Sequence, residues 1–175
     1  MERTLTAFSA IILLIGCCTG CGRNKTITKS KMPDIVFMYC QSSEDSFVSK
    51  FCDKNGNCYA IISKDVKNMD INELNRSFAQ GRLGKDIKLI KSGDRDEVEK
   101  AYTKFDAASK QDNIGLIQPT EVPAVEAPSM AWYGICSNEN DKLEKVCIHE
   151  NKCMTDVYSG NNDINDVYDW LSDKL

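Results

Sequence analysis

Two groups of three cysteines recur in the chain with nearly the same spacing. The first group is Cys40, Cys52 and Cys58, and the second is Cys136, Cys147 and Cys153. Eleven residues in the first group and ten in the second separate the first two cysteines, and five separate the last two in both. Each group follows an aromatic-rich apolar run and precedes a similar acidic segment, which starts at Asp70 or at Asp163. The matched order predicts two related small α+β modules, each an antiparallel sheet of a strand and a hairpin with a C-terminal helix, stapled by disulfides.

The first cysteine group lies in a predicted strand and hairpin. Residues 34–40 and 46–52 have the aromatic and β-branched content of strands, and residues 59–63 form the returning strand. Between them, Asp53-Lys54-Asn55-Gly56-Asn57 is typical of a turn, because Asn-Gly adopts the positive φ that hairpin turns need. Cys52 and Cys58 therefore face each other, and a bond between them adds about 2.4 kcal/mol in the chain-entropy model.

Helix signals follow each hairpin. Asp70 is the predicted N-cap of a helix with Ile71, Leu74 and Phe78 on one face. A further strand over 86–91 and a helix over 94–109 complete the first module, residues 34–117, and we expect this helix to pack on the first module's sheet. The apolar face of that helix comprises Val98, Ala101, Tyr102, Phe105 and Ala108. Three prolines between 118 and 129 indicate an extended linker.

The second module, residues 130–175, repeats the pattern more briefly. Strands end at Cys136 and Cys147, residues 148–152 form a hairpin loop, and a closing helix begins at Asp163. The buried stripe of that helix is Ile164, Val167, Tyr168 and Leu171. By analogy with the first hairpin, Cys147 pairs with Cys153. One cysteine is then left over in each module, and we expect Cys40 to pair with Cys136; the alternative partners are Cys18 and Cys21.

The N-terminal residues have the pattern of an export signal. Arg3 precedes an apolar stretch of eleven residues, which is shorter than the roughly 20 residues of a membrane-spanning helix. The stretch ends in Leu14-Ile15-Gly16-Cys17.

This ending resembles the lipobox of bacterial lipoproteins, in which a leucine, a small or medium residue and a glycine or alanine precede a cysteine. The resemblance covers residues 1–17 only. It implies that residues 1–16 are a cleaved signal peptide, that Cys17 carries acyl chains, and that residues 17–33 are a lipidated flexible tether. Cys18, rather than aspartate, follows Cys17, and this favours the outer membrane, with the protein facing the periplasm or the surface. The alternatives are an ordinary secretory signal or an uncleaved anchor.

Cysteine content and charge agree with the bacterial cell envelope. The chain has nine cysteines, and removing Cys17 leaves an even number, which suits disulfides in an oxidising compartment. The formal net charge is −4, with nine acids against four bases from Met130 onward. An acidic C-terminal half is unlike a nucleic-acid surface, which needs clustered Lys and Arg.

The chemistry-bearing residues indicate no enzyme and no metal site. His149 is the only histidine, and no paired Cys-x-x-Cys motif occurs, so a zinc site is not predicted and no cofactor is expected. A Cys147–His149 nucleophile and base is the weaker interpretation, since Cys147 already has a structural role. A hydrolase using unrecognised carboxylates is a further alternative.

We therefore predict a membrane-anchored lipoprotein that binds another protein. The favoured hypothesis is an inhibitor or immunity protein against an envelope-targeting toxin or hydrolase, and the alternative is a structural or exclusion lipoprotein of an envelope assembly. The membrane is contacted through acylated Cys17, the protein partner is expected to be basic, and nucleic acid is not a partner. The candidate contact residues are His149, Glu150, Asp163, Asp166, Asp169, Trp170 and Asp173.

Overall fold

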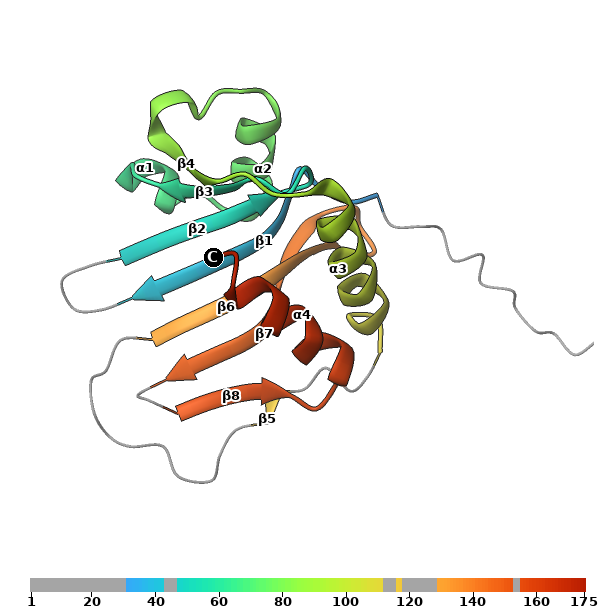
Figure 1. The fold of residues 1–175 in the computed structure, drawn as a ribbon. Coiled ribbons are helices and arrows are strands. Elements are labelled where there is room, and N and C mark those ends of the chain that lie inside the picture. Colours follow the sequence, from blue (N-terminus) through green and yellow to red (C-terminus); the bar gives the residue numbers. More distant parts are fainter. Residues whose placement is uncertain (1–30, 43–46, 112–115, 118–128, 153–154) are drawn as a thin grey trace, which may run out of the picture.

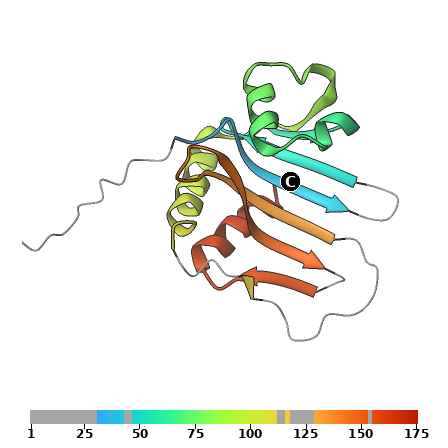
Figure 2. The same cartoon turned by 180° about the vertical axis from the view of Figure 1, so that it is seen from behind.

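A computed structural model describes residues 31–42, 47–111, 116–117, 129–152 and 155–175. The predicted signal peptide, Cys17, most of the tether and residues 118–128 of the linker lie outside this part of the chain. The described residues form an α+β fold in which helices cover both faces of one antiparallel sheet (Figures 1 and 2). The strands are β1 (Ile35–Ser42), β2 (Phe47–Asp53), β3 (Cys58–Ile61), β4 (Ile87–Lys91), β5 (Leu116–Ile117), β6 (Ser129–Ser137), β7 (Leu143–Lys152) and β8 (Thr155–Ser159).

The sheet has eight strands in the order β4-β3-β2-β1-β6-β7-β8-β5. The two segments that we predicted as modules meet at its centre, where β1 pairs with β6 in the register Phe37↔Gly134. Each segment then extends outward by a hairpin, through β2 and β3 on one side and through β7 and β8 on the other. Both segments therefore contribute to one continuous sheet.

The helices divide between the two faces. They are α1 (Lys64–Lys67), α2 (Ile71–Ala79), the 3-10 turn η1 (Gly84–Asp86), α3 (Arg95–Ala108) and α4 (Asn162–Ser172). Helices α1 and α2 cover one apolar core, which contains Met38, Phe51 and Ile135. Helices α3 and α4 cover the other, which contains Phe37, Cys52 and Ile148. Neighbouring residues of β1 and β2 enter opposite cores because side chains alternate along a strand.

Helix α3 packs on the first module's sheet, as predicted, and on the C-terminal segment as well. Its buried residues are the five that the sequence indicated, Val98, Ala101, Tyr102, Phe105 and Ala108. They contact α4 and β6 of the C-terminal segment as well as Phe37 of β1. The helix that we assigned to the first module's sheet therefore joins the two segments.

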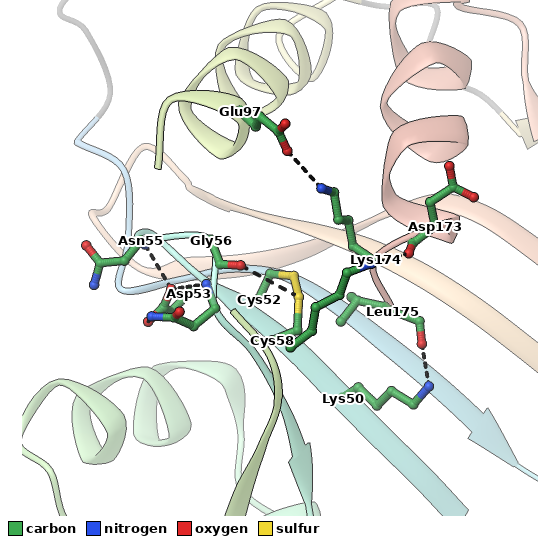
Figure 3. The surroundings of a disulfide bond; sticks show 12 residues. Lys50, Cys52, Asp53, Asn55, Gly56, Cys58, Glu97, Asp173, Lys174 and Leu175 are labelled. Carbon is green, nitrogen blue, oxygen red and sulfur yellow. Dashed lines mark hydrogen bonds and ion pairs between the residues drawn. A yellow bond between two sulfur atoms is a disulfide. The ribbon is translucent and has the colours of Figure 1, made fainter. Parts of the chain in front are cut away.

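The first hairpin has the predicted turn and disulfide. Cys52 and Cys58 form a disulfide bond and lie directly opposite each other on β2 and β3. They are 1% and 0% exposed, respectively. Lys50 Nζ donates to the main-chain oxygen of Leu175, so the end of the chain lies beside this bond (Figure 3). The prediction of the Cys52–Cys58 disulfide is confirmed.

The other cysteines depart from the predicted pairing. Cys40 packs against the α2 core and Cys136 against the α3–α4 core, so the two thiols lie on opposite faces of the sheet and are not bonded. The predicted Cys40–Cys136 bond is therefore wrong, because a disulfide requires Cα atoms closer than about 7 Å and side chains that point together. Cys153, Cys18 and Cys21 lie outside the described residues, and the predicted Cys147–Cys153 bond stays a prediction.

The turn between β2 and β3 depends on one buried carboxylate. Asp53 is 3% exposed, and its Oδ1 accepts hydrogen bonds from the backbone N–H groups of Asn55 at 2.8 Å and Asn57 at 2.9 Å. Gly56 has φ +85°, and a Cβ there would meet the Asp94 backbone at 2.7 Å. The motif is thus a turn fixed by its own aspartate.

Asp53→Ala is expected to lower the free energy of unfolding by about 2 kcal/mol, because two partly buried backbone N–H groups of the turn lose their acceptor. Urea unfolding of the oxidised protein measures this. Asn55→Ala is the matched control, since the Asn55 side chain is exposed, and it should change stability by less than about 0.5 kcal/mol. Equal losses in the two variants would contradict the role of the Asp53 carboxylate.

Candidate functional site

The exposed face of α4 carries most of the predicted contact residues. Asp163, Asp166, Asp169 and Asp173 are all exposed, and Trp170 is partly buried. The helix begins one residue earlier than predicted, because Asn161 is the N-cap and its Oδ1 accepts from the N–H groups of Asp163 at 2.9 Å and Ile164 at 3.4 Å. The structure therefore places these five side chains on one element, with the carboxylates toward solvent.

A shallow cleft of about 280 Å³ lies between α3 and α4. Its apolar lining comes from Ala101 on α3 and from Val167 and Trp170 on α4. Its charged lining is Glu97, Lys100, Lys104 and Asp166. We call these seven residues the α3–α4 cleft. Sequence reasoning found its α4 side and missed its α3 side, since only the fold brings the two helices together.

Two ion pairs cross from α3 to the C-terminal helix region at the edges of this cleft. Lys104 Nζ is 2.7 Å from Asp166 Oδ2, and Lys174 Nζ is 2.8 Å from Glu97 Oε2. The hydrogen bond and charge of Lys174 lower the pKa of Glu97, and those of Asp166 raise the pKa of Lys104. Exposed pairs of this kind contribute little stability. Their consequence is that the cleft has a mixed charge instead of the uniformly acidic character that the sequence suggested.

Trp170 has a double role in this arrangement. Its ring lies 5.7 Å from the ring of Phe37 in the core, and Lys174 Nζ lies 5.6 Å above it. The same side chain lines the α3–α4 cleft. The sequence analysis names Trp170 as a contact residue, and the structure gives its ring both a buried and a cleft-lining side.

His149 and Glu150 are not on the predicted exposed loop. Residues 148–152 belong to β7, and a bulge opposite Trp132 and Tyr133 places Ile148 in the core. His149 is 5% exposed and its ring stacks on Tyr168 at 3.8 Å. The interpretation of His149 as a surface contact is therefore wrong. Ile148 is buried in the core and the His149 ring packs on Tyr168, so this segment is part of the sheet.

The thiol of Cys147 and the imidazole of His149 have different surroundings. Cys147 Sγ lies 3.6 Å from the backbone oxygen of His149. The imidazole packs against Tyr168 and, at 5.5 Å between centroids, against Trp132. A nucleophile and base would need the thiol and a ring nitrogen within hydrogen-bond reach. The contact of Cys147 Sγ is to the backbone oxygen of His149 and so does not support such a pair.

A second cluster, not indicated by the sequence, lies on the α2 side of the sheet around Tyr133. The pKa of Tyr133 is raised to about 12, mainly by burial and to a lesser extent by the neighbouring Cys147, Cys40 and Glu150. Burial also raises the pKa of Cys40, whose Sγ lies 3.8 Å from Ser49 Oγ. Cys40 is therefore a protonated thiol at neutral pH, which is a poor nucleophile.

The raised pKa of Tyr133 predicts a stability loss in alkali. Its ordinary pKa is 10.0 and its folded value is about 12, so its contribution to stability is complete below pH 10 and is lost as the pH rises toward 12. Ultraviolet titration of tyrosinate should lose a group with a pKa of about 12 in Tyr133→Phe, and the variant should lose less stability over this interval. Burial raises the pKa values of Tyr39 and Tyr59 as well, so the difference between the two titration curves identifies Tyr133. If the group lost in Tyr133→Phe instead has a pKa near the ordinary 10.0, the Tyr133 hydroxyl is not buried.

A larger cleft of about 520 Å³ lies where the described chain begins. It is lined by Lys31, Met32, Lys54, Arg95, Glu99, Tyr102, Thr103 and Asp106. Lys54 Nζ pairs with Asp34 at 2.6 Å, and Asp106 Oδ2 pairs with Lys110 at 2.6 Å. The cleft and these two partners together have four bases and three acids, so the charge of this region is mixed.

Among the described residues, no helix is long and apolar enough to cross a bilayer. No group of three or more His, Cys, Asp or Glu side chains in the same residues could hold a metal ion.

Comparison with known proteins finds no relative of the chain. It matches no protein-family model, no curated protein and no solved structure. The N-terminal motif and the surfaces described above are therefore the features that bear on its function.

Proposed function

We propose that the protein is a lipid-anchored component of the bacterial cell envelope that binds and inhibits another protein, as an immunity protein does. The observation that carries the proposal is the α3–α4 cleft, in which an aromatic ring and two small apolar residues are surrounded by charges. Half-buried tryptophans with a charged rim are common centres of protein interfaces. The lipobox-like Leu14 to Cys17 supports the anchorage.

The charge of the surface supports a partner with basic groups facing α4. Lys104 already pairs with Asp166. Asp163, Asp169 and Asp173 are exposed and form no ion pair with the residues that the structure describes. Three uncompensated carboxylates on one helix face would steer a basic partner, and Trp170 would provide the apolar contact.

Capture from periplasmic and secreted proteins tests the proposal. The oxidised protein is immobilised, and bound proteins are identified and their affinities measured at several salt concentrations. One stoichiometric, salt-sensitive partner that loses its toxic or hydrolytic activity when bound is the expected result. Retention of envelope assembly components without inhibition would favour the structural or exclusion lipoprotein instead.

A charge-matched pair of variants locates the interface. Neutralising the α4 face with Asp163→Asn, Asp169→Asn and Asp173→Asn should weaken binding by roughly tenfold or more and flatten its salt dependence. The control changes three exposed acids elsewhere, Glu73→Gln, Glu139→Gln and Asp141→Asn, and so has the same net charge. An equal effect of the two triple variants would exclude α4 as the contact face.

Anchorage has its own test. The mass of the N-terminal peptide from membrane fractions should correspond to an acylated Cys17, and Cys17→Ser should release the protein from the membrane. An unmodified N-terminal peptide of a membrane-bound protein would indicate an uncleaved anchor in place of a lipoprotein.

We also infer that the two cysteine-spaced segments descend from one duplicated sequence unit. The order β3-β2-β1-β6-β7-β8, which is symmetric about the β1–β6 pair, supports this. Helices α2 and α4 lie on opposite faces, however, so the units differ in three-dimensional arrangement. A twofold axis perpendicular to the sheet would relate the strands of the two segments. Such an axis keeps each face of the sheet in place, so it would put α2 and α4 on the same face, unlike the observed arrangement.

A further inference from the structure

Two ion pairs close the ends of the α3–α4 cleft. Lys104, near the end of α3, pairs with Asp166, near the start of α4. Glu97, near the start of α3, pairs with Lys174, which follows the end of α4. The two helices are therefore antiparallel, and each ion pair bridges them at one end of the cleft. The two α3 residues are seven positions apart, so the cleft is only about 10 Å long.

The floor of the cleft is apolar and well packed. Ala101 and Val167 are 7% and 1% exposed, and the ring of Trp170 lies against Phe37 in the core. The volume of about 280 Å³ is below the range of about 300–1,000 Å³ that is usual for small-molecule sites. Pockets in protein interfaces commonly receive one anchor side chain of the partner, and such anchors contribute much of the binding energy. The occupant that fits this short cleft is therefore one large apolar side chain.

The charges in the cleft favour an apolar anchor over a cationic one. Its two acids, Glu97 and Asp166, are already paired with Lys174 and Lys104. Lys100 forms no ion pair with the described residues, so the cleft and its two bridging pairs have one lysine in excess. An inserted lysine or arginine would therefore meet an excess of positive charge.

The surface of α4 just outside the cleft is acidic. Asp173 follows Trp170 by three residues, so the two side chains are neighbours on the helix surface, and Asp169 is one turn before Asp173. Both carboxylates are exposed and form no ion pair within the part of the chain that the structure describes. Lys91 Nζ reaches the backbone oxygen of Asp173 at 2.9 Å and leaves the carboxylate unpaired. A basic residue beside the anchor would therefore find a carboxylate within reach.

We propose that the partner inserts one large apolar side chain, aromatic or leucine-like, between α3 and α4, and that an arginine or lysine stands beside this anchor in the partner's sequence. The inference rests on the proposed function, whose contact surface includes the α3–α4 cleft. A side chain that enters a cleft closed at both ends must project from its own surface. The proposal thus restricts the partner to proteins that present such a pair of residues on a protruding part of their surface.

Short capped peptides test the proposal without the unidentified partner. The oxidised protein is labelled with ¹⁵N and titrated with acetyl-Phe-Arg-amide, and the indole N–H signals of its two tryptophans are followed by NMR. The Trp170 signal should shift with a dissociation constant in the millimolar range, whereas Trp132, which does not line the cleft, should keep its position. Trp170→Phe assigns the signals.

Two altered peptides measure what the cleft selects. Replacing phenylalanine by glycine should weaken binding by roughly tenfold or more, which is the usual effect of losing a large buried apolar side chain. Replacing arginine by glutamate should weaken it by about two- to fivefold, the range of an exposed ion pair. Equal binding of the phenylalanine and glycine peptides, or equal shifts of both indole signals, would overturn the proposal.

Filling the cleft is the first test on the protein side. Ala101→Leu places a larger side chain over the floor and should abolish the Trp170 shift. The Trp132 indole signal reports whether the variant is folded, and it should stay in place. A full Trp170 shift in the folded variant would overturn the proposal.

Asp169→Asn with Asp173→Asn tests the basic neighbour, at exposed positions where substitution leaves the fold intact. This variant should bind the arginine and glutamate peptides equally and still prefer phenylalanine to glycine. Glu73→Gln with Glu139→Gln changes the net charge equally and should keep the preference for arginine. An arginine preference that survives in the first variant would overturn the proposal, also where Ala101→Leu fails to fold.

Failure of this proposal and failure of the proposed function are distinguishable. Peptide binding at Trp170 reports on the cleft alone, whereas capture with loss of the partner's activity reports on inhibition. A captured and inhibited protein that leaves the Trp170 signal unchanged would overturn the cleft proposal and support the function. Peptide binding at Trp170 without any inhibited partner would support the cleft proposal and overturn the function.

Discussion

Gly134→Ala is expected to destabilise the folded protein by about 3 kcal/mol, which is the upper part of the usual cost of overpacking a core. A Cβ at Gly134 would lie 2.3 Å from Cε2 and Cζ of Phe105 and 2.6 Å from Cε1. Phe105 is completely buried, so its ring has no space into which it can move. Gly134 thus allows α3 to approach the sheet closely. This packing explains why β6 contains a glycine, although glycine weakens strands in general.

A double-mutant cycle measures whether the clash with Phe105 is the cause. Phe105→Ala alone should cost about 3–5 kcal/mol through the cavity that it leaves. In that background Gly134→Ala should cost little, because the added methyl group enters the cavity, and the coupling should be about 2 kcal/mol. Urea unfolding of the four proteins gives the values. Simple additivity would show that the cost at Gly134 arises from the strand backbone and not from α3.

The sequence was most informative where local chemistry decides the structure. The N-cap role predicted for Asp70 is confirmed, since its Oδ1 accepts from the backbone N–H groups of Asn72 and Glu73. Asp94, where the next helix was predicted to begin, is the N-cap of α3 and accepts from the N–H group of Asp96. The turn at Asp53 and the Cys52–Cys58 disulfide are also confirmed. Each of these features involves residues fewer than ten positions apart, and short separations leave few alternatives.

Pairing over long distances could not be predicted in the same way. The β1–β6 register joins Phe37 to Gly134, and spacing within each cysteine group does not specify it. A shift of one residue exchanges the faces of every side chain in a strand. The observed register of β1 with β6 puts Cys40 and Cys136 on opposite faces of the sheet. Their predicted bond is therefore excluded, although the two positions match in the sequence.

The candidate site was predictable on one helix only. Acids at three-residue spacing put Asp163, Asp166 and Asp169 on the exposed side of α4. The contribution of α3, including Lys104, depends on how two helices from distant segments pack. His149 was misplaced because a β-bulge, for which the sequence has no signal, extends β7 through the expected loop.

The two predicted modules can be distinguished from one cooperative fold by a single core residue. Phe37 of β1 is completely buried, and its ring lies 6.5 Å from Tyr102 and 5.9 Å from Phe105 of α3 and 5.7 Å from Trp170 of α4. Phe37→Ala should lower the free energy of unfolding by about 3–5 kcal/mol. Phe47→Ala is the control, because this ring is 40% exposed, and it should cost less than about 1 kcal/mol.

Amide hydrogen exchange of the Phe37→Ala variant then tests how the two segments depend on each other. Phe37 is in the N-terminal segment, whereas α4 and its Trp170 are in the C-terminal one, so protection of α3 and α4 should fall together in this variant. Independent modules would give a different pattern, in which α4 keeps its protection while the N-terminal segment exchanges. We expect the joint loss, because one ring fills the space between a shared sheet and a helix from each side of the predicted linker.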